Sequence, residues 1–265
     1  MRKYHPGAAG VNGEEKDVLS EDSAGDSIVD RPGFEASTLA HHVYRELESG
    51  LIDGVLLPET RLSLRSIATQ LNTSMQPVRE AVSKLVADSA LEVTPGRAVR
   101  VPRLDREQAD EVWAIRVLLE GEAAARFAAR RRPEEVEALY AQTRAMRPLY
   151  FADDVPALMR ALRRWNIALV YGSHMPVLTD LVMRLRLRYA PFTAACLAAE
   201  TPPDPNFLNF TLRMQDEMTR AIEAGDVAAA RYLRCSTIRG FQHYLYERIR
   251  WIPPLDWVPG SDAPR

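Results

Sequence analysis

Residues 74–91 read SMQPVREAVSKLVADSAL, and their spacing predicts a helix from Met75 to about Asp88. Ser74 is a favourable N-cap residue, and Pro77 is tolerated because it would lie in the first turn. Apolar residues recur at helical spacing and would face a core: Val78, Val82 and Leu85. The remaining positions leave a polar face on the same helix.

Two further helices are predicted upstream of this one. Ser37 or Thr38 can cap the first, whose apolar residues are Leu39, Val43, Leu47 and Leu51, and the second fits residues 64–71. Downstream, residues 91–94 and 98–101 are typical of short strands around a Pro-Gly turn. Three short helices and a hairpin make up a winged helix-turn-helix, predicted here over residues 37–103. Such units bind DNA, but they also occur as interaction modules.

The charge of the chain is distributed unevenly. The 265 residues carry a formal net charge of −2, which taken alone argues against a nucleic-acid partner. Residues 1–36 hold 4 basic and 8 acidic side chains and few large apolar ones, which predicts a disordered acidic leader. Residues 61–103 hold 7 basic and 3 acidic side chains. A positive region therefore coincides with the predicted helix-turn-helix and hairpin.

From Asp105 to residue 250 the pattern is helical, without the alternation typical of strands. Capping residues and breaks divide it into six or seven helices. We expect Pro191 to end a helix over residues 175–189, with a shorter helix around 192–199 after it. The predicted fold class is mostly α: an N-terminal winged helix-turn-helix, then an all-helical bundle over 104–250 that can enclose a cavity, then a tail over 251–265.

Other function classes are disfavoured by the same sequence. No apolar run approaches the roughly 18 residues of a membrane helix. The two cysteines, Cys196 and Cys235, are too few for a disulfide framework, which suggests a reducing, cytoplasmic compartment. We find no paired carboxylates at credible spacing, no nucleophile–base arrangement and no glycine-rich phosphate loop. We therefore expect no enzymatic activity.

Residues 56–101 resemble the DNA-binding domain of the GntR family of bacterial transcription regulators. The family pattern Ser-Arg-x-Pro-Val-Arg-Glu-Ala-Leu is matched by Ser74, Pro77, Val78, Arg79, Glu80 and Ala81. The resemblance implies DNA contacts from Arg65, Ser74, Gln76, Arg79 and, in the wing, Arg97. Met75 stands where the family usually has an arginine, and Ala98 replaces the customary wing glycine. These departures imply an unusual operator preference, since one guanine contact provides about 1–3 kcal/mol of discrimination.

Each of these arginines also has a purely structural interpretation. Arg79 can form a salt bridge within the domain, for instance to Glu46 or Glu80. Arg65 can be a solvated side chain at a helix start, and Arg97 a flexible, exposed wing residue.

Residues 105–250 resemble the FCD effector domain of the FadR-like branch of that family. The matching features are Arg116 with Glu120, the run Ser173-His174-Met175-Pro176, and Ala221-Ile222-x-x-x-Asp226. Many such domains bind a divalent metal through one Asp and three His, and the metal helps to hold a small carboxylate. The corresponding positions here are Leu162, Asn166, Gln215 and Thr237, none of which is a carboxylate or an imidazole. We therefore expect no metal cofactor.

Three residues are candidates for effector binding. Asn166 and Gln215 would still offer hydrogen bonds from these inward positions, and Arg116 could bind an anionic group in a bidentate manner. The alternatives are that Asn166 and Gln215 are satisfied by neighbours or water, and that Arg116 pairs with Glu120 inside the bundle.

Together these features predict a DNA-binding transcription regulator whose operator binding is controlled by a small-molecule effector, either a carboxylate or an apolar molecule. A homodimer would place two recognition helices on a two-fold operator. An alternative keeps the fold but has a degenerate, metal-free effector domain that acts constitutively or binds an acyl-type ligand.

Overall fold

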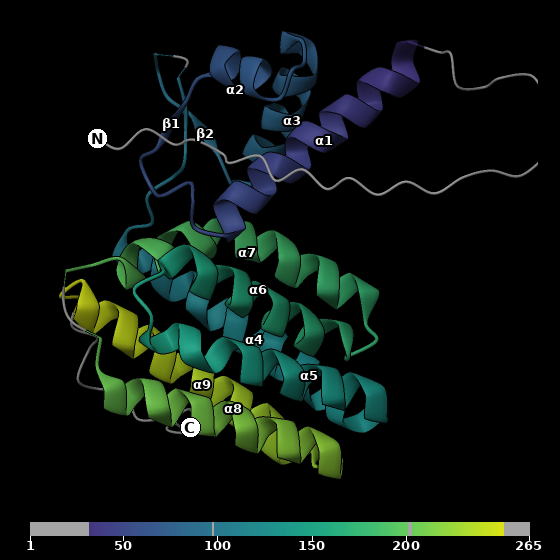
Figure 1. Cartoon of the computed structure of the whole chain (residues 1–265), viewed down its shortest axis with the longest axis vertical. Coiled ribbons are helices and arrows are strands. Elements are labelled where there is room, and N and C mark those ends of the chain that lie inside the picture. The colour runs from purple at the N-terminus through teal and green to yellow at the C-terminus, as the bar shows by residue number, and fades with distance from the viewer. Residues whose placement is uncertain (1–31, 97, 201–202, 252–265) are drawn as a thin grey trace, which may run out of the picture.

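The computed structural model describes residues 32–96, 98–200 and 203–251. In this part of the chain a small unit of helices and short strands lies on a larger bundle of helices (Figure 1). The predicted fold class, mostly α with a winged helix-turn-helix ahead of a helical bundle, is confirmed. Residues 1–31 of the predicted leader, Arg97 of the wing and residues 252–265 of the predicted tail lie outside the described residues.

The N-terminal unit contains three helices and a sheet of very short strands. The helices are α1 (Pro32–Ile52), α2 (Leu64–Gln70) and α3 (Met75–Ala87). The strands β1 (Arg61–Leu62), β2 (Glu92–Val93) and β3 (Val99–Arg100) form an antiparallel sheet in the order β1-β3-β2. The predicted hairpin forms β2 and β3. Strand β1 was not predicted, because two residues are too few to show an alternation.

The core of this unit is built from the predicted apolar faces of α1 and α3, which contribute Val43, Leu47, Leu51, Val78, Val82 and Leu85. Leu39, predicted to join them, is exposed. The predicted start of α1 is wrong: the helix begins at Pro32, so Ser37 and Thr38 lie inside it and residues 32–36 belong to the helix. Proline is favourable in the first turn because the N–H that it lacks would have no intrahelical partner there.

The C-terminal unit contains six α-helices within the described residues, and none of the described helices is long and apolar enough to cross a membrane. They are α4 (Arg106–Arg130), α5 (Pro133–Met146), α6 (Val155–Tyr171), α7 (Pro176–Leu197), α8 (Pro205–Ala224) and α9 (Val227–Arg248), with a 3-10 turn over Arg147–Phe151. Asp105 and Gln108 form a capping box at the start of α4. The bundle extends one residue past its predicted end, since Trp251 packs against Phe192 and Tyr246.

Helix α7 differs from the prediction at Pro191. We expected this proline to separate two helices, but α7 continues through it to Leu197. A proline inside a helix removes one backbone hydrogen bond and crowds the preceding turn. Here Pro191 is buried, and its neighbours Ala190 and Phe192 lie in the core of the bundle. Tertiary packing therefore offsets the local cost, and one helix of 22 residues replaces two.

The two units meet where the end of α1 lies against α6 and α7, while α8 and α9 lie on the far side of the bundle (Figure 1). Leu187 of α7 belongs to the hydrophobic core of the N-terminal unit. Arg163 of α6 donates hydrogen bonds to Ser49 Oγ at 3.2 Å and to Asp53 Oδ1 at 3.4 Å. The contact between the two units therefore combines hydrophobic packing with an ion pair, and α7 contributes to the cores of both units.

Gly54, just after α1, completes this contact. Its φ is +72°, and a Cβ at this position would lie 2.5 Å from the Cβ of Ala194 on α7 and 3.2 Å from Cγ of Met159 on α6. Both the backbone conformation and the close approach therefore require glycine.

Gly54→Ala is expected to lower the free energy of unfolding by about 2 kcal/mol or more. A left-handed conformation costs an L-residue roughly 1–2 kcal/mol, and the new methyl group would overlap Ala194. Urea denaturation measures the change. The matched control is Gly96→Ala in the hairpin turn, where an added Cβ meets no atom within 4 Å. Equal stability of the two variants would contradict this view of the contact.

Candidate functional site

The start of α3 is exposed and polar. Ser74 occupies the N-cap position with an extended backbone, but its side chain makes no capping hydrogen bond. The hydroxyl and the first N–H groups of α3 are therefore open to an external acceptor such as a phosphate. Helix α2, by contrast, is capped internally, since Ser63 Oγ accepts a hydrogen bond from the N–H of Ser66.

All four described residues that the sequence assigns to DNA contact are exposed: Arg65, Ser74, Gln76 and Arg79. They lie at or near the starts of α2 and α3, which pack against each other. Gln76 donates a hydrogen bond to Glu80 at 2.8 Å. Within the described part of the chain Arg79 pairs with no carboxylate, so the salt bridge to Glu46 or Glu80 that we considered is not formed. Arg79 is thus open to an external partner.

The wing contributes less positive charge than its composition suggests. Arg100 is paired twice within the sheet region, with Glu59 at 2.9 Å and with Glu92. Arg61 on β1 and Arg103 after β3 are exposed. The positive surface of the N-terminal unit is therefore made mainly by α2, α3 and the margins of the sheet.

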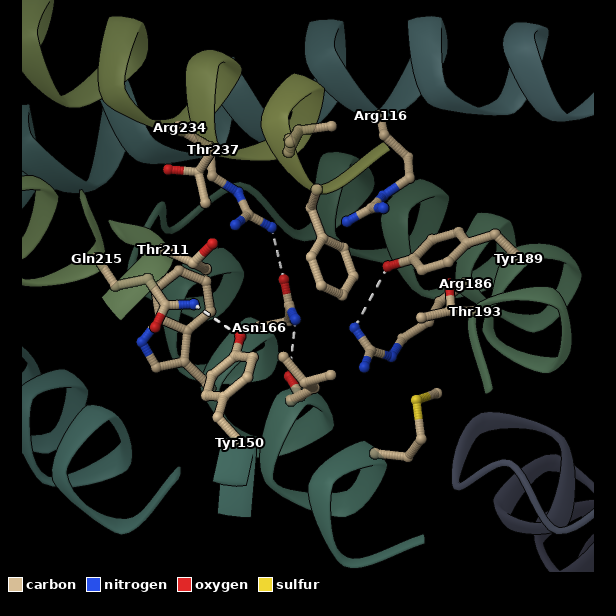
Figure 2. A pocket seen from close by; sticks show the side chains of 15 residues that line it. Arg116, Tyr150, Asn166, Arg186, Tyr189, Thr193, Thr211, Gln215, Arg234 and Thr237 are labelled. Carbon is tan, nitrogen blue, oxygen red and sulfur yellow. Dashed lines mark hydrogen bonds between the residues drawn. The ribbon is translucent and has the colours of Figure 1, made fainter. Parts of the chain in front are cut away.

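The four positions that correspond to FCD metal ligands come together inside the bundle. Leu162 and Asn166 of α6, Gln215 of α8 and Thr237 of α9 line one cavity of about 40 Å³, shown in Figure 2. Helices α4 and α7 complete its wall with Arg116, Arg186, Tyr189 and Thr193. This volume holds a few water molecules, far less than the roughly 300–1,000 Å³ of pockets for drug-sized ligands. Only a compact ligand fits without rearrangement.

The groups at these four positions do not fit a divalent cation. The amide of Asn166 is used at both ends: Nδ2 donates to the Leu162 carbonyl at 2.7 Å, and Oδ1 accepts from Arg234 at 2.6 Å. Thr237 donates its hydroxyl to the carbonyl of Leu233. Among the described residues no group of three or more His, Cys, Asp or Glu side chains is placed to hold a metal. Dications need several oxygen or imidazole ligands, usually including charged ones.

A buried ion-pair network forms one side of the cavity. Glu120 accepts hydrogen bonds from Nε of Arg116 at 2.7 Å and from Nη2 of Arg234, and all three side chains are buried. The Arg116 guanidinium also lies 4.3 and 4.0 Å from the ring centroids of Trp113 and Tyr189. Burial alone would raise the pKa of Glu120, but the two guanidinium groups hold that pKa at about 2. The pairing of Arg116 with Glu120, which the sequence left open, is what the structure shows.

Arg186 of α7 is a charged cavity residue that sequence reasoning missed. It is 3% exposed, and its Nη1 donates to the hydroxyl of Tyr189 at 3.3 Å. Its Nε has no partner, and no carboxylate among the described residues pairs with it. Burial lowers the pKa of this guanidinium, and the charge of Arg116 adds to the effect. The sequence does contain a sign that Arg186 is buried, because it follows Leu178 and Val182 at i, i+4 spacing on the buried face of α7.

Other polar atoms around the cavity also lack partners. Gln215 Nε2 reaches the hydroxyl of Tyr150 at 3.5 Å, but its Oε1 is unpaired. Thr193 Oγ1 and Arg234 Nε are buried and unpaired as well. Figure 2 shows the side chains of Arg116, Arg186 and Arg234 directed toward the same space from α4, α7 and α9. This arrangement is suited to a compact polar or anionic molecule.

Comparison with known proteins identifies relatives of both units. The model of the "Bacterial regulatory proteins, gntR family" matches residues 39–101, and the "FCD domain" model matches residues 111–238. The chain is 31% identical over 154 residues to the HTH-type transcriptional regulator McbR of Escherichia coli (strain K12), an alignment that spans 58% of this chain and 70% of McbR. An uncharacterized HTH-type transcriptional regulator of Agrobacterium vitis is 28% identical over 150 residues, spanning 56% of this chain and 84% of that protein.

Solved structures show the same architecture. That of E. coli McbR/YncC matches with a TM-score of 0.73 at 27% identity, covering 80% of this chain and 98% of that one. A transcriptional regulator GntR from Rhodococcus sp. RHA1 matches with a TM-score of 0.64 at 21% identity, covering 79% and 98%. The second match supports the fold alone.

Glu120→Gln is expected to lower the free energy of unfolding at neutral pH by about 3–5 kcal/mol, because it leaves the buried arginines without their carboxylate. The folded-state pKa of about 2 lies below the ordinary value of 4.5, so the carboxylate stabilises the fold above about pH 4.5 and this contribution is lost as pH falls toward 2. Urea denaturation across this range should show a steeper decline for the wild type than for the variant. Glu111→Gln, an exposed position on α4, is the control. Parallel pH profiles of wild type and Glu120→Gln would contradict the role of the network.

Proposed function

Because this chain belongs to the GntR family of bacterial regulatory proteins, in the branch that carries an FCD domain, we propose that it binds a two-fold DNA operator as a homodimer under the control of a small polar effector. The observation that carries the proposal is the position of α7, which lines the bundle cavity with Arg186 and enters the core of the winged unit with Leu187. Control of DNA binding by an effector is the function typical of this family.

The DNA-binding face is the start of α2 and α3. A helix of this size fits the major groove, where arginine and glutamine can read base edges, and the N-terminus of α3 can bind a phosphate. Arg65, Ser74, Gln76 and Arg79 are exposed there. Arg97 of the wing stays a prediction from the family pattern. We expect the protein to act in the bacterial cytoplasm, where operator DNA lies.

The effector acts through the shared helix α7. Arg186 and Leu187 are neighbours on one turn of α7, and Leu187 packs against the winged unit. A ligand that favours one placement of the Arg186 side chain therefore also favours one placement of Leu187 against that unit. Met159 offers a second route, because it lines the cavity and approaches Gly54 at the domain contact. Differential affinity for two arrangements of the units is the condition for control by a ligand.

A polar effector is favoured over an acyl chain. An acyl chain would place hydrocarbon against three buried guanidinium groups and would leave Arg186 without a carboxylate partner, and an unpaired buried charge is costly. The cavity is also too small for a long chain. Catalysis is not part of the proposal, since the carboxylate in the network, Glu120, is held by two arginines and has no free basic role. The matched relatives are named as transcriptional regulators.

A second copy of the chain is proposed to cover the apolar face shared by α4 and α7. Four large apolar side chains are exposed there: Ile115, Leu118, Val177 and Leu181. Leu118 and Val177 are 71% and 75% exposed, which is unusual for residues next to a packed helix pair. This face adjoins the end of α3, where Ala87 and Asp88 lie near Ile115 and Leu181. A dimer formed here would bring the two winged units side by side, as a two-fold operator requires.

Arg79→Ala is expected to weaken operator binding by roughly 10-fold or more, because loss of one base or phosphate contact costs about 1–3 kcal/mol. Fluorescence anisotropy with a DNA fragment selected by the wild type from a random pool measures the affinity over a range of salt concentrations. The control is Arg213→Ala, an exposed arginine on α8, far from the winged unit. Unchanged affinity of Arg79→Ala would refute its DNA contact, and no binding by the wild type at low salt would refute the proposed function.

Leu118→Glu is expected to convert a dimer into a monomer, because it places a charge in the apolar contact. Light scattering coupled to size exclusion should give a wild-type mass of twice the 29.8 kDa chain and a variant mass near that of one chain. Tyr232→Glu, at an exposed aromatic residue on α9, is the control and should stay dimeric. A monomeric wild type, or a dimeric Leu118→Glu, would refute this interface.

A further inference from the structure

We propose that the bundle cavity is a metal-independent receptor for a compact anion with about two negative charges, a small dicarboxylate or a divalent oxyanion, and that Arg186 is the residue that binds it. The proposal rests on the proposed function and names the chemistry of its effector. It assigns to three arginine side chains the positive charge that a metal ion supplies in other domains of this kind.

The first observation is the charge balance of the interior. Arg116, Arg186 and Arg234 line the cavity. Among the described residues, Glu120 is the carboxylate that pairs with Arg116 and Arg234, and none pairs with Arg186. Arginine stays protonated in proteins, so three positive charges face one negative charge. None of the described residues that line the cavity is acidic, since Glu120 lies behind Arg116 and Arg234 rather than in the lining. A ligand with two negative charges would neutralise the remaining net charge of these four side chains.

The second observation is the state of Arg186. Arg116 and Arg234 share Glu120. Arg186 has one hydrogen bond, at 3.3 Å to the hydroxyl of Tyr189, and its guanidinium lies 5.8 Å from the centroid of that ring. Its Nε has no acceptor among the described atoms. An unpaired buried charge is strongly destabilising in a protein interior. A planar guanidinium that is buried and free of carboxylates is ready to bind a carboxylate or oxyanion through two parallel hydrogen bonds. The burial of Arg186 is explained if a ligand completes its coordination.

The third observation is the position of Arg234 relative to the former metal-ligand positions. Its Nη2 donates to Asn166 Oδ1 at 2.6 Å and is held by Glu120. A fixed cation therefore already lies beside the four positions, and its charge would repel a dication. Gln215 Oε1 and Thr193 Oγ1, both unpaired, can accept or donate further hydrogen bonds to a ligand. The site is thus equipped for an anion.

The experiment is isothermal titration of the full-length protein after exhaustive treatment with EDTA. Malonate and inorganic phosphate are the dianionic probes, acetate is the monoanion, and malonamide is the uncharged analogue of malonate. We expect saturable binding of malonate or phosphate below about 10 mM, at least 10-fold tighter than acetate, and none of malonamide. Binding of malonate alone indicates a dicarboxylate effector, and binding of phosphate alone indicates an oxyanion.

Arg186→Met tests the assigned residue, and Arg164→Met, at an exposed arginine on α6, is the matched control. We expect Arg186→Met to bind the dianion at least 30-fold more weakly while its ligand-free Tm rises, because an unpaired buried charge has been removed. Arg164→Met should change neither the affinity for the dianion nor the Tm. Arg186→Lys, which keeps the charge but loses the planar fork, should weaken binding about 10-fold, and it replaces the Met variant if that variant does not fold.

Several results would overturn the proposal: no binding of either dianion to the metal-free protein, binding that appears only after a divalent metal is added, equal binding of malonamide, or unchanged affinity in the Arg186 variants. Operator binding is measured separately by anisotropy on the same preparations. DNA binding without anion binding would refute this inference and leave the proposed function intact. Anion binding by a protein that binds no DNA would refute the proposed function alone.

Discussion

The carboxylate of Glu120, on α4, lies between the guanidinium groups of Arg116, on the same helix, and Arg234, on α9. Arg234 extends the network to Asn166 on α6, so one buried acid ties together three helices of the bundle. Each of these charges would be destabilising if it were buried alone, because nothing would offset the free energy lost with its hydration. The helices that carry them must therefore pack in the one arrangement that keeps all the partners together. The shape of the cavity follows from that constraint.

Glu120 forms ion pairs with Arg116 and Arg234, and the third cavity arginine, Arg186, has no carboxylate partner among the described residues. Arg186 enters the cavity from α7, which is tied to the others by apolar packing through Val170, Leu178 and Val182. The wall that carries the unpaired charge is thus outside the ion-pair network. In a metal-dependent domain the positive charge at this place leaves when the ion is removed. Here the positive charge is carried by arginine side chains, so the receptor that we propose would have a fixed charge and the planar geometry of a guanidinium.

Most of the fold could be predicted from the sequence because it depends on local features. Helical periodicity, capping aspartates and a Pro-Gly turn placed the elements of both units. The errors lie where tertiary packing overrides local preference: Pro191 continues a helix because it is buried, and α1 begins upstream of the residues that were expected to cap it.

The cavity was only partly predictable. The family pattern pointed to Asn166, Gln215 and Arg116, which do line it. Arg234 and Arg186 carry no motif, and their importance comes from what surrounds them in three dimensions. An arginine that follows apolar residues at i, i+4 spacing, as Arg186 follows Leu178 and Val182, is nevertheless a signal that the sequence contains.

Helix α7 brings these features together. Because Pro191 has no N–H, it cannot donate to the carbonyl of Leu187, four residues earlier, so the helix lacks one hydrogen bond in the turn that follows Arg186. Leu187 packs in the winged unit, and Arg186 points into the cavity. The turn of α7 that lacks this hydrogen bond therefore lies where the cavity and the DNA-binding unit meet, and a missing backbone hydrogen bond lowers the resistance of a helix to bending. The proline that was expected to end the helix instead removes one of its hydrogen bonds next to Arg186, the residue to which we assign the effector.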